Sequence, residues 1–370
     1  MSSRTVLILV LALAVIALAV IVAVPIVRSR QGRATLPPAP TTAGPWYELH
    51  FTTPVYPDRA ETRRGGLDER LVALIDATQK SLDVAIYDFD LANAAQAMVR
   101  ARQRGVAVRM VTDSDTVNQR DQAVQAALKT VRDAGVPVVD DQRRAIMHHK
   151  FVVSDGVSVL TGSWNFTLGD TYRLNNNLAI LRSPELAANY ATEFEKMFGR
   201  RQFGPTKPKD KPHPTVTLSG ARVETYFASQ EDPTERIVSA IREARSKVDF
   251  LAFSFTHDAI GTAMTDKHRA GVKVRGVFEN TGSETRFSEY GRLKEAGAEV
   301  YQDGNPYVMH HKVIVVDDHL VIFGSFNFSD NAAEENDENL LVVDDPIFAN
   351  AFSAEVNRMV ALAQNPIRTR

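Results

Sequence analysis

Two segments of the chain carry the same reactive side chains in the same order. Each starts with a histidine, has a lysine two residues later and an aspartate five residues after that, and ends in Gly-Ser-x-Asn. Each residue of the second segment follows its counterpart by 162 positions. A single histidine and lysine in a strand would be weak evidence of function, but a complete second copy at the same internal spacing is strong evidence. The first set is His148, Lys150, Asp155, Ser163 and Asn165, and the second is His310, Lys312, Asp317, Ser325 and Asn327.

An imidazole, an ammonium, a hydroxyl and an amide together suit a tetrahedral phosphate. Lysine and asparagine can stabilise the nonbridging oxygens as negative charge develops on them. Histidine titrates near neutral pH, so it can act as a nucleophile, an acid or a base. Two such sets suit a phosphodiester, because one neutral histidine can attack phosphorus while a protonated one releases the leaving alcohol. This chemistry requires no metal ion, and we expect no metal and no cofactor.

Both sets lie in sequence that is typical of β-strands. Because side chains alternate along a strand, His148 and Lys150 are expected on one face and His149 on the other. Asp155-Gly156 predicts a two-residue hairpin loop. That loop would place Lys150 opposite Thr161, and it would gather the first set on one face of the hairpin. The repeat predicts the same arrangement for the second set.

The repeat extends well beyond the reactive residues. Val106–Arg109 matches Val272–Arg275 at an offset of 166, and the offset changes to 162 before the histidines. Within each copy, apolar runs typical of strands alternate with segments of helical periodicity. In the first copy the strands are expected at Asp83–Phe89 and Val106–Thr112, and the helices at Leu91–Arg102 and Asp121–Asp133. This alternation predicts an α/β fold with two tandem lobes, each a mixed sheet with helices outside.

Proline-rich stretches divide the chain. The segment 204–214 holds four prolines and is the expected linker between the lobes. A second stretch, at 34–47, is expected to be a semi-stiff spacer. The predicted domains are therefore a membrane anchor at 1–33, the spacer at 34–47, a first lobe at 48–203, the linker at 204–214 and a second lobe at 215–370.

The N-terminal segment Val6–Val27 has 22 residues without a charged or polar side chain. As a helix it would span the hydrocarbon core of a bilayer, which is about 30 Å thick. A cleaved signal peptide is the alternative, but its apolar region would be shorter and would end at small residues, whereas arginines follow here. We expect a single-pass membrane protein whose catalytic part lies outside the cytoplasm.

Composition and charge restrict the function further. The 370 residues include 43 Lys and Arg, 45 Asp and Glu, and no cysteine, which excludes disulfides and cysteine-ligated metals. The first 33 residues hold four arginines and no acid, so the rest carries a formal charge of −6. A broad basic surface for nucleic acid is therefore not expected, although Arg143-Arg144 could form a local basic patch.

The duplicated HxK(x)4D motif followed by GSxN resembles the signature of the phospholipase D superfamily, and the resemblance covers about residues 48–360. It implies two lobes packed face to face with one active site between them. It also implies that His148 is the nucleophile, forming a phosphohistidine, and that His310 is the general acid and then the base. Lys150, Lys312, Asn165 and Asn327 would hold the phosphate. Asp155 and Asp317 belong to the signature, but their place in the hairpin loop favours a structural role.

The same family has an acidic residue about 28 positions after the motif histidine, which orients a histidine. The second lobe has Glu338 at this position, whereas the first has Asn176. We expect Glu338 to hold one histidine, in its own lobe or across the interface, and to make the pKa values of the two histidines unequal. The alternative is that Glu338 is one more solvated acid in the run 334–338.

The preferred function is a phospholipase D-type hydrolase acting on a phospholipid at the membrane. The alternatives are a membrane-anchored nuclease that cleaves DNA or RNA, a transphosphatidylating enzyme similar to cardiolipin synthases, and a membrane-tethered binding module with inactive motifs. No protein partner is required, because both motifs lie in one chain. Aromatic residues beside the motifs could line a groove for acyl chains, or could belong to the core; these are Trp164, Phe166, Tyr307, Phe326 and Phe328.

Overall fold

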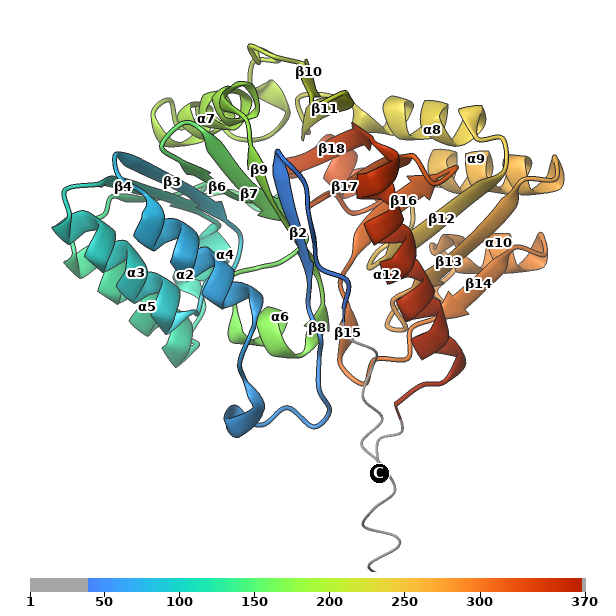
Figure 1. The fold of residues 1–370 in the computed structure, drawn as a ribbon, viewed down its shortest axis with the longest axis horizontal. Coiled ribbons are helices and arrows are strands. Elements are labelled where there is room, and N and C mark those ends of the chain that lie inside the picture. Colours follow the sequence, from blue (N-terminus) through green and yellow to red (C-terminus); the bar gives the residue numbers. More distant parts are fainter. Residues whose placement is uncertain (1–38, 368–370) are drawn as a thin grey trace, which may run out of the picture. The chain divides into compact units, whose positions relative to one another are not determined.

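Two eight-stranded sheets dominate the computed structural model, which describes residues 39–367 (Figure 1). The strand order is β1-β2-β9-β7-β6-β3-β4-β5 in the first sheet and β10-β11-β18-β17-β16-β12-β13-β14 in the second. The two orders correspond strand by strand. In each sheet three neighbouring strands are parallel and the others antiparallel, so the predicted pair of mixed sheets is confirmed.

The first sheet is built from the chain before the 204–214 linker. Its strands are β1 (Thr42–Ala43), β2 (Tyr47–Phe51), β3 (Ser81–Ile86), β4 (Ala107–Thr112), β5 (Val138–Asp140), β6 (Lys150–Ser154), β7 (Ser158–Gly162) and β9 (Asn177–Arg182). The second sheet follows the linker. Its strands are β10 (Thr215–Leu218), β11 (Ala221–Ala228), β12 (Lys247–Ala252), β13 (Lys273–Phe278), β14 (Glu299–Gln302), β16 (Lys312–Val316), β17 (Leu320–Gly324) and β18 (Glu338–Asp344).

Helices cover both faces of each sheet (Figure 1). Those of the first lobe are α2 (Leu67–Ala77), α3 (Ala92–Gln103), α4 (Ser114–Asn118), α5 (Gln122–Asp133), α6 (Leu168–Tyr172) and α7 (Pro184–Phe198), with a 3-10 turn η1 (Ala60–Thr62). Those of the second are α8 (Pro233–Glu243), α9 (Asp258–Arg269), α10 (Glu289–Glu295), α11 (Asp330–Glu334) and α12 (Pro346–Gln364). A 3-10 turn, η2 (Gly204–Thr206), begins the linker.

Sequence periodicity explains how these helices pack. In α5, Asp121 accepts hydrogen bonds from the first backbone amides, and Val124, Leu128 and Val131 are buried on one face. That face packs on α3 and, with α2, covers alternate residues of β3. The opposite face of the sheet is covered by α7. The predicted strands and helices of the first copy are therefore present within two or three residues of their expected ends.

Short strand pairings join the two lobes. The parallel pair β8 (Leu174–Asn175) and β15 (Val308–Met309) connects them on one side, and an isolated bridge between Met147 and Asp337 connects them on the other. Each pairing ends in a hydrogen bond from the backbone amide of a motif histidine to the other lobe. His148 N donates to Asp337 O at 2.9 Å, and His310 N donates to Asn175 O at 2.9 Å. The backbone of each histidine is thus fixed by the opposite lobe.

The hairpin that carries the first motif has a different register from the predicted one. Phe151, not Lys150, lies opposite Thr161. The loop has three residues, Asp155–Val157, because Asp155 and Gly156 both adopt positive φ (53° and 66°). The additional loop residue shifts every pairing in the hairpin by one position.

The linker at 204–214 is fixed to both lobes. Lys207 is buried, and its ammonium bonds to Glu193 of the first lobe and Asp337 of the second. Lys196 donates to the backbone oxygens of Pro208 and Asp210 at 2.7 and 2.9 Å. Two of the three lysines of this segment, Lys207 and Lys211, therefore make ion pairs with residues of the lobes.

Within residues 39–367, no helix is both long and apolar enough to cross a membrane. The predicted anchor at Val6–Val27 lies outside the described residues.

Candidate active site

His148 is held by an acidic residue of the other lobe. Its Nδ1 atom lies 2.8 Å from both carboxylate oxygens of Glu338, which is fully buried. Ser325 donates to Glu338 Oε2 at 2.6 Å, so a second residue fixes the carboxylate. Of the two possibilities left open for Glu338, the structure shows the contact across the interface, and it excludes a solvated acid.

His310 has a neutral partner at the equivalent position. Its Nδ1 atom lies 3.0 Å from the amide oxygen of Asn176, which also accepts a 2.8 Å hydrogen bond from Ser163. Both histidines are therefore held in the same way, each by a residue of the other lobe. Asn176 holds His310, and Glu338, which is equivalent to Asn176 in the repeat, holds His148. The partners differ in charge, because one is a carboxylate and the other an amide.

The two lysines occupy equivalent buried positions. Lys150 Nζ donates to the backbone oxygen of His148 at 2.8 Å, and Lys312 Nζ donates to that of His310 at 2.8 Å. Each side chain is 1% exposed, so its charge is desolvated. Burial lowers the pKa of Lys150 to about 8, and burial and the charge of Lys150 lower the pKa of Lys312 well below its usual value.

Burial and these ammonium groups also act on the histidines. Burial is the main cause that holds the pKa of His148 and of His310 well below the ordinary value, and Lys150 and Lys312 add to the effect. Burial raises the pKa of Glu338 to about 7. Burial therefore favours neutral imidazoles beside the two lysines, and an anionic phosphate placed there would favour the charged ammonium groups.

The two copies of the motif also share an aromatic neighbour that was not predicted from the sequence. The ring of Tyr87 lies 5.1 Å from that of His148, and the ring of Phe253 lies 4.7 Å from that of His310. Tyr87 and Phe253 are 166 positions apart, which is the offset of the first half of the repeat. The repeat could therefore have pointed to them as equivalent residues. Each ring also lies near the ammonium of the lysine in its own lobe.

A family model described as cardiolipin synthase, PLD-like domain, matches the chain twice, at residues 71–198 and 237–360. The chain belongs to the phospholipase D superfamily. Both matched segments include a complete motif, and together they cover most of both lobes.

Individual relatives support the same assignment. The chain is 31% identical over 165 residues to a phospholipase D from Rickettsia bellii, a match that covers 45% of this chain and 81% of that protein. It is 33% identical over 129 residues to the human mitochondrial cardiolipin hydrolase, covering 35% of this chain and about half (51%) of the relative. One of these relatives is named a phospholipase and the other a cardiolipin hydrolase.

A solved structure shows the same fold over almost the whole chain. The phosphatidylserine synthase of Haemophilus influenzae superposes with a TM-score of 0.63 at 15% identity, covering 90% of this chain and 89% of that one. The tandem arrangement of the two phospholipase D-like lobes is therefore present in a known structure.

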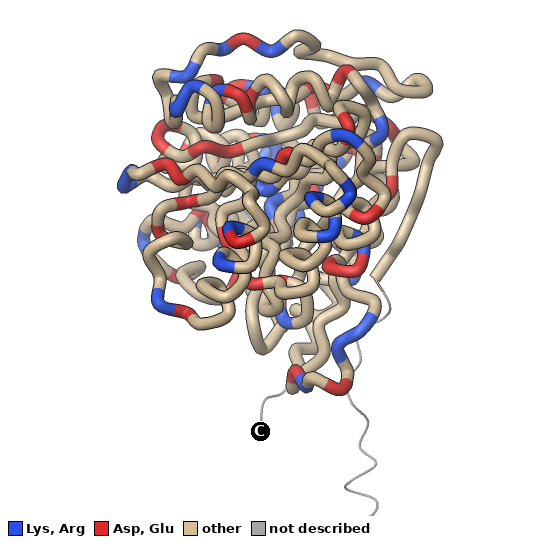
Figure 2. The backbone as a smooth tube through the Cα atoms, turned by 90° about the vertical axis from the view of Figure 1, so that its left-hand side faces the viewer, with Lys and Arg blue, Asp and Glu red and all other residues tan. Residues whose placement is uncertain are grey.

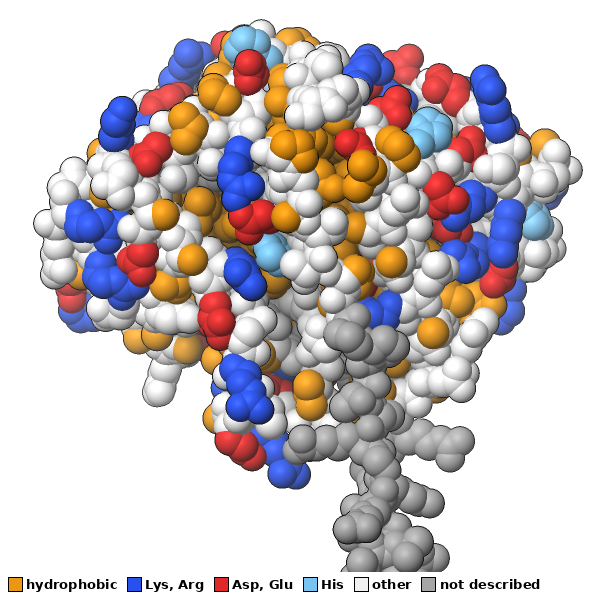
Figure 3. All heavy atoms as spheres, in the orientation of Figure 1, with side chains coloured by type: hydrophobic (Ala, Val, Ile, Leu, Met, Phe, Trp, Pro, Cys, Tyr) orange, Lys and Arg blue, Asp and Glu red, His pale blue; other side chains and the backbone are white. Residues whose placement is uncertain are grey.

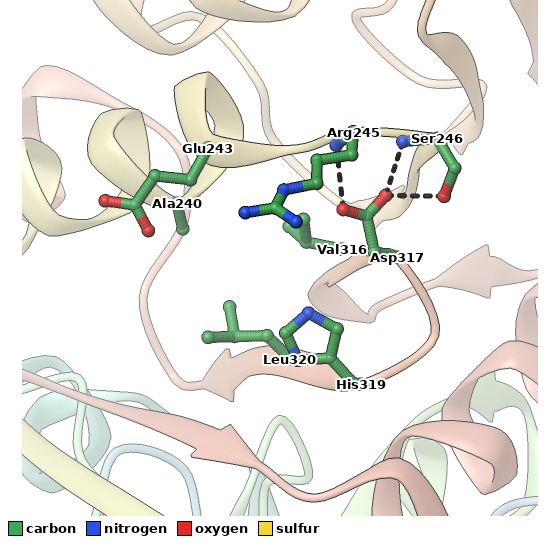
Figure 4. A pocket seen from close by; sticks show the side chains of 8 residues that line it. All are labelled: Ala240, Glu243, Arg245, Ser246, Val316, Asp317, His319 and Leu320. Atoms are coloured by element: carbon green, nitrogen blue, oxygen red, sulfur yellow. Dashed lines mark hydrogen bonds between the residues drawn. The ribbon is translucent and has the colours of Figure 1, made fainter.

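The aspartates of the phospholipase D signature do not join the site. Asp155 accepts hydrogen bonds from the backbone amides of Gln79, Lys80 and Ser81, at the far end of β6 from His148. Asp317 does the same for residues 245–247, and Figure 4 shows its carboxylate bonded to Arg245 and Ser246 beside a pocket of about 860 Å³. Asp155 and Asp317 therefore fix the starts of β3 and β12, which is the structural role that their place in the hairpin loop predicted, and they lie outside the catalytic set to which the signature assigns them.

The aromatic residues proposed for an acyl groove are mostly in the core. Four of them are each 1% exposed and pack in the hydrophobic core of their own lobe. These are Trp164, Phe166, Phe326 and Phe328. Tyr307 is half-buried, and its ring lies 5.4 Å from that of Tyr56 at a tilt of 55°. Of the two possibilities that the sequence left open, these four residues take the place in the core.

The other predicted phosphate ligands lie beside the histidines. Ser163 and Ser325 are buried and bond to Asn176 and Glu338, so they position the groups that hold the histidines. The amide oxygens of Asn165 and Asn327 are buried and have no hydrogen-bond partner within the described residues.

Behind the site, each lobe has a second buried histidine on the opposite face of its strand, as the alternation predicts. His311 Nε2 lies 3.0 Å from Glu355, and His149 Nε2 lies 3.5 Å from Glu193. His149, Glu193 and Asp337 are close enough together to hold a metal ion, but the ammonium of Lys207 bonds to both carboxylates. The ammonium of Lys207 therefore occupies the place between the carboxylates that a metal ion would take.

Proposed function

We propose that the protein hydrolyses a phospholipid phosphodiester through a covalent phosphohistidine, with His148 as the nucleophile and His310 as the acid and base. The observation that carries this assignment is the difference between the partners of the two histidines. Glu338 accepts a hydrogen bond from Nδ1–H of His148. Its carboxylate stabilises the positive charge that develops on the ring when Nε2 attacks phosphorus. Nδ1 of His310 is bonded by the neutral amide of Asn176, with the Asp170 carboxylate only at 3.5 Å, so His310 holds an added proton less firmly and returns it more readily.

The reaction has two steps. In the first, Nε2 of His148 forms a bond to phosphorus, the bond to the leaving alcohol breaks, and His310 gives its proton to that alcohol. In the second, His310 takes a proton from water, the water oxygen bonds to phosphorus, and the bond to His148 breaks. The product is a phosphate monoester, and Lys150 and Lys312 neutralise the phosphoryl oxygens in both steps.

The protonated state of His310 follows from substrate binding. The pKa of His310 is low because the residue is buried near two ammonium groups. A bound phosphodiester places a negative charge between these ammonium groups, which opposes their effect and raises the pKa of His310. Substrate thus creates the acid that the first step needs, while Glu338 keeps His148 in the Nδ1–H tautomer.

A lipid substrate has more support than a nucleic acid. The relatives are named phospholipase D and cardiolipin hydrolase. Basic and acidic residues are interspersed along the backbone in Figure 2, and the face shown in Figure 3 has no broad basic track. Arg143 of the expected basic patch is paired with Asp337 at 2.9 Å, so it is committed to the interior. The proposal includes attachment through Val6–Val27, with the catalytic part outside the cytoplasm.

The test uses the full chain purified in detergent and assayed in EDTA on phosphatidylcholine, cardiolipin and single-stranded DNA. We expect release of the head-group alcohol from the lipids and no cleavage of DNA. We expect His148→Ala to abolish this release. Cleavage of DNA alone would contradict the lipid substrate, and full activity of His148→Ala would contradict the mechanism. Accessibility of the lobes to protease in intact cells tests the membrane orientation.

A further inference from the structure

The repeat contains a second charge difference beside the histidines. At the offset of 162, Asn176 corresponds to Glu338, and Asp170 corresponds to Ala332. The first lobe therefore lacks the acid at one position and has an acid at another, where the second lobe has a methyl group. Asp170 is in α6, next to the segment that carries Asn176.

Asp170 is buried and makes contact with both Asn176 and the histidine that Asn176 holds. Its Oδ1 atom accepts hydrogen bonds from Asn176 Nδ2 at 3.2 Å and from Asn165 N at 3.1 Å. The same oxygen lies 3.5 Å from His310 Nδ1. The backbone oxygen of Asp170 also accepts from Asn176 Nδ2, at 3.1 Å. Both acceptors draw the NH2 group of Asn176 away from His310.

A helix cap does not explain this carboxylate. Asp170 Oδ2 does accept from Thr167, the N-cap residue of α6. In the second lobe Ser329 caps α11 through the amide of Ala332, and α11, which is five residues long like α6, has alanine rather than an acid at the position of Asp170. The second lobe is therefore an internal control, and it shows that the cap alone requires no aspartate.

We propose that Asp170 is a positioning residue for His310, acting through the amide of Asn176 and replacing the carboxylate that the first lobe lacks at position 176. By binding Nδ2 of Asn176 it directs the amide oxygen at His310, and an oxygen acceptor requires His310 Nδ1 to carry a proton. Nε2 then faces the substrate, where the acid and base chemistry takes place. This inference rests on the proposed function for the role of His310 in turnover.

The charge of Asp170 has a second effect on His310. The charged or titratable groups around His310 are Lys312, Lys150, His148, His311 and Asp170. The two lysines disfavour a protonated imidazole, whereas the Asp170 carboxylate favours it. A carboxylate at 3.5 Å acts more weakly than one in direct contact, as Glu338 is with His148. His310 therefore becomes protonated when substrate binds and still releases the proton to the leaving group.

The kinetic test compares two substrates. Phosphatidylcholine has a poor leaving group that needs a proton from His310, whereas a p-nitrophenyl phosphodiester releases nitrophenolate without one. We expect Asp170→Asn to slow choline release by about tenfold to a hundredfold, a part of the usual effect of a general acid. We expect it to leave the nitrophenolate burst nearly unchanged. Equal losses with both substrates, or no loss with either, would overturn the proposal.

Two further variants separate positioning from folding. The double variant Asp170→Ala/Asn176→Glu gives the first lobe the residues of the second, and we expect it to recover choline release relative to Asp170→Ala alone. No recovery in a double variant with the melting temperature of the wild type would overturn the proposal. Asp232→Asn, which alters the capping acid of α8 in the other lobe, is the matched control, and we expect it to leave the ratio of the two rates unchanged.

The tautomer of His310 can be measured without substrate. In ¹⁵N-histidine NMR spectra, assigned with His310→Gln, we expect a neutral Nδ1–H tautomer for His310 in the wild type and a mixture of tautomers in Asp170→Asn. The same tautomer in both proteins would overturn the proposal. A wild type that hydrolyses no phosphodiester would instead contradict the proposed function, and the NMR result would still decide the role of Asp170.

Discussion

Nδ1 of His148 lies 2.8 Å from the carboxylate of Glu338, a residue 190 positions away in the other lobe. The equivalent contact of His310 is to the amide of Asn176. Each lobe thus completes the histidine of the other, and neither lobe alone contains a complete catalytic group. The phospholipase D lobes of this chain are two halves of one site.

The contact between His148 and Glu338 predicts the effect of Glu338→Gln. A glutamine cannot stabilise the imidazolium of His148, so we expect kcat/KM to fall by about a hundredfold or more. Burial raises the pKa of Glu338 to about 7, so the wild type loses the carboxylate, and with it activity, as the pH falls through this value. The variant should lack this acidic decline. An unchanged rate and pH profile would show that Glu338 does not assist His148.

The buried lysines predict the alkaline side of the same profile. Burial lowers the pKa of Lys150 to about 8, and it is the protonated form that binds phosphate. We therefore expect kcat/KM to decline above about pH 8, which is below the range in which an exposed lysine loses its charge. The measurement is kcat/KM from pH 6 to 10 on an uncharged-headgroup phosphodiester. A flat profile up to pH 10 would contradict the lowered pKa.

Much of the fold could be predicted from the sequence because the repeat is long and its apolar periodicity is local. The hairpin register could not, because the conformation of Asp155 depends on its bonds to Gln79, Lys80 and Ser81, which are distant in sequence. The partner of Glu338 depends in the same way on how the lobes pack. Tyr87 and Phe253 could have been predicted, because they occupy equivalent positions in the two copies of the repeat.

The signature aspartates are predicted to affect stability rather than catalysis. Asp155→Ala would leave three backbone amides without their acceptor, so we expect the free energy of unfolding to fall by about 1–3 kcal/mol. For Asp317, burial alone would raise the pKa, but hydrogen bonds from Ser246, Lys247 and Arg245 hold it below its usual range. The stabilisation from Asp317 should therefore be present at neutral pH and be lost as the pH falls below about 4.

Asp155→Ala and the matching Asp317→Ala are measured by denaturant unfolding and by kcat/KM at a temperature where both are folded. Unchanged kcat/KM is expected for each. A large loss of kcat/KM in a variant of normal stability would return Asp155 or Asp317 to the catalytic machinery.

The linker lysine is predicted to hold the two lobes together. Lys207→Met would leave the buried carboxylates of Glu193 and Asp337 without their shared cation. We expect a loss of about 3–5 kcal/mol in the free energy of unfolding. Lys209→Met, in the same linker but without a recorded ion pair in the described residues, is the control. Equal stability of the two variants would show that the linker contact is dispensable.

The most direct test of the account is the nitrophenolate burst of the two histidine variants with a p-nitrophenyl phosphodiester. This leaving group needs no proton, so His310→Ala should still release one equivalent and accumulate a phosphoryl group on His148. His148→Ala should show no burst and no phosphoenzyme. A burst in His148→Ala, or a phosphoryl group found on His310 in the wild type, would contradict the assignment of His148 as the nucleophile.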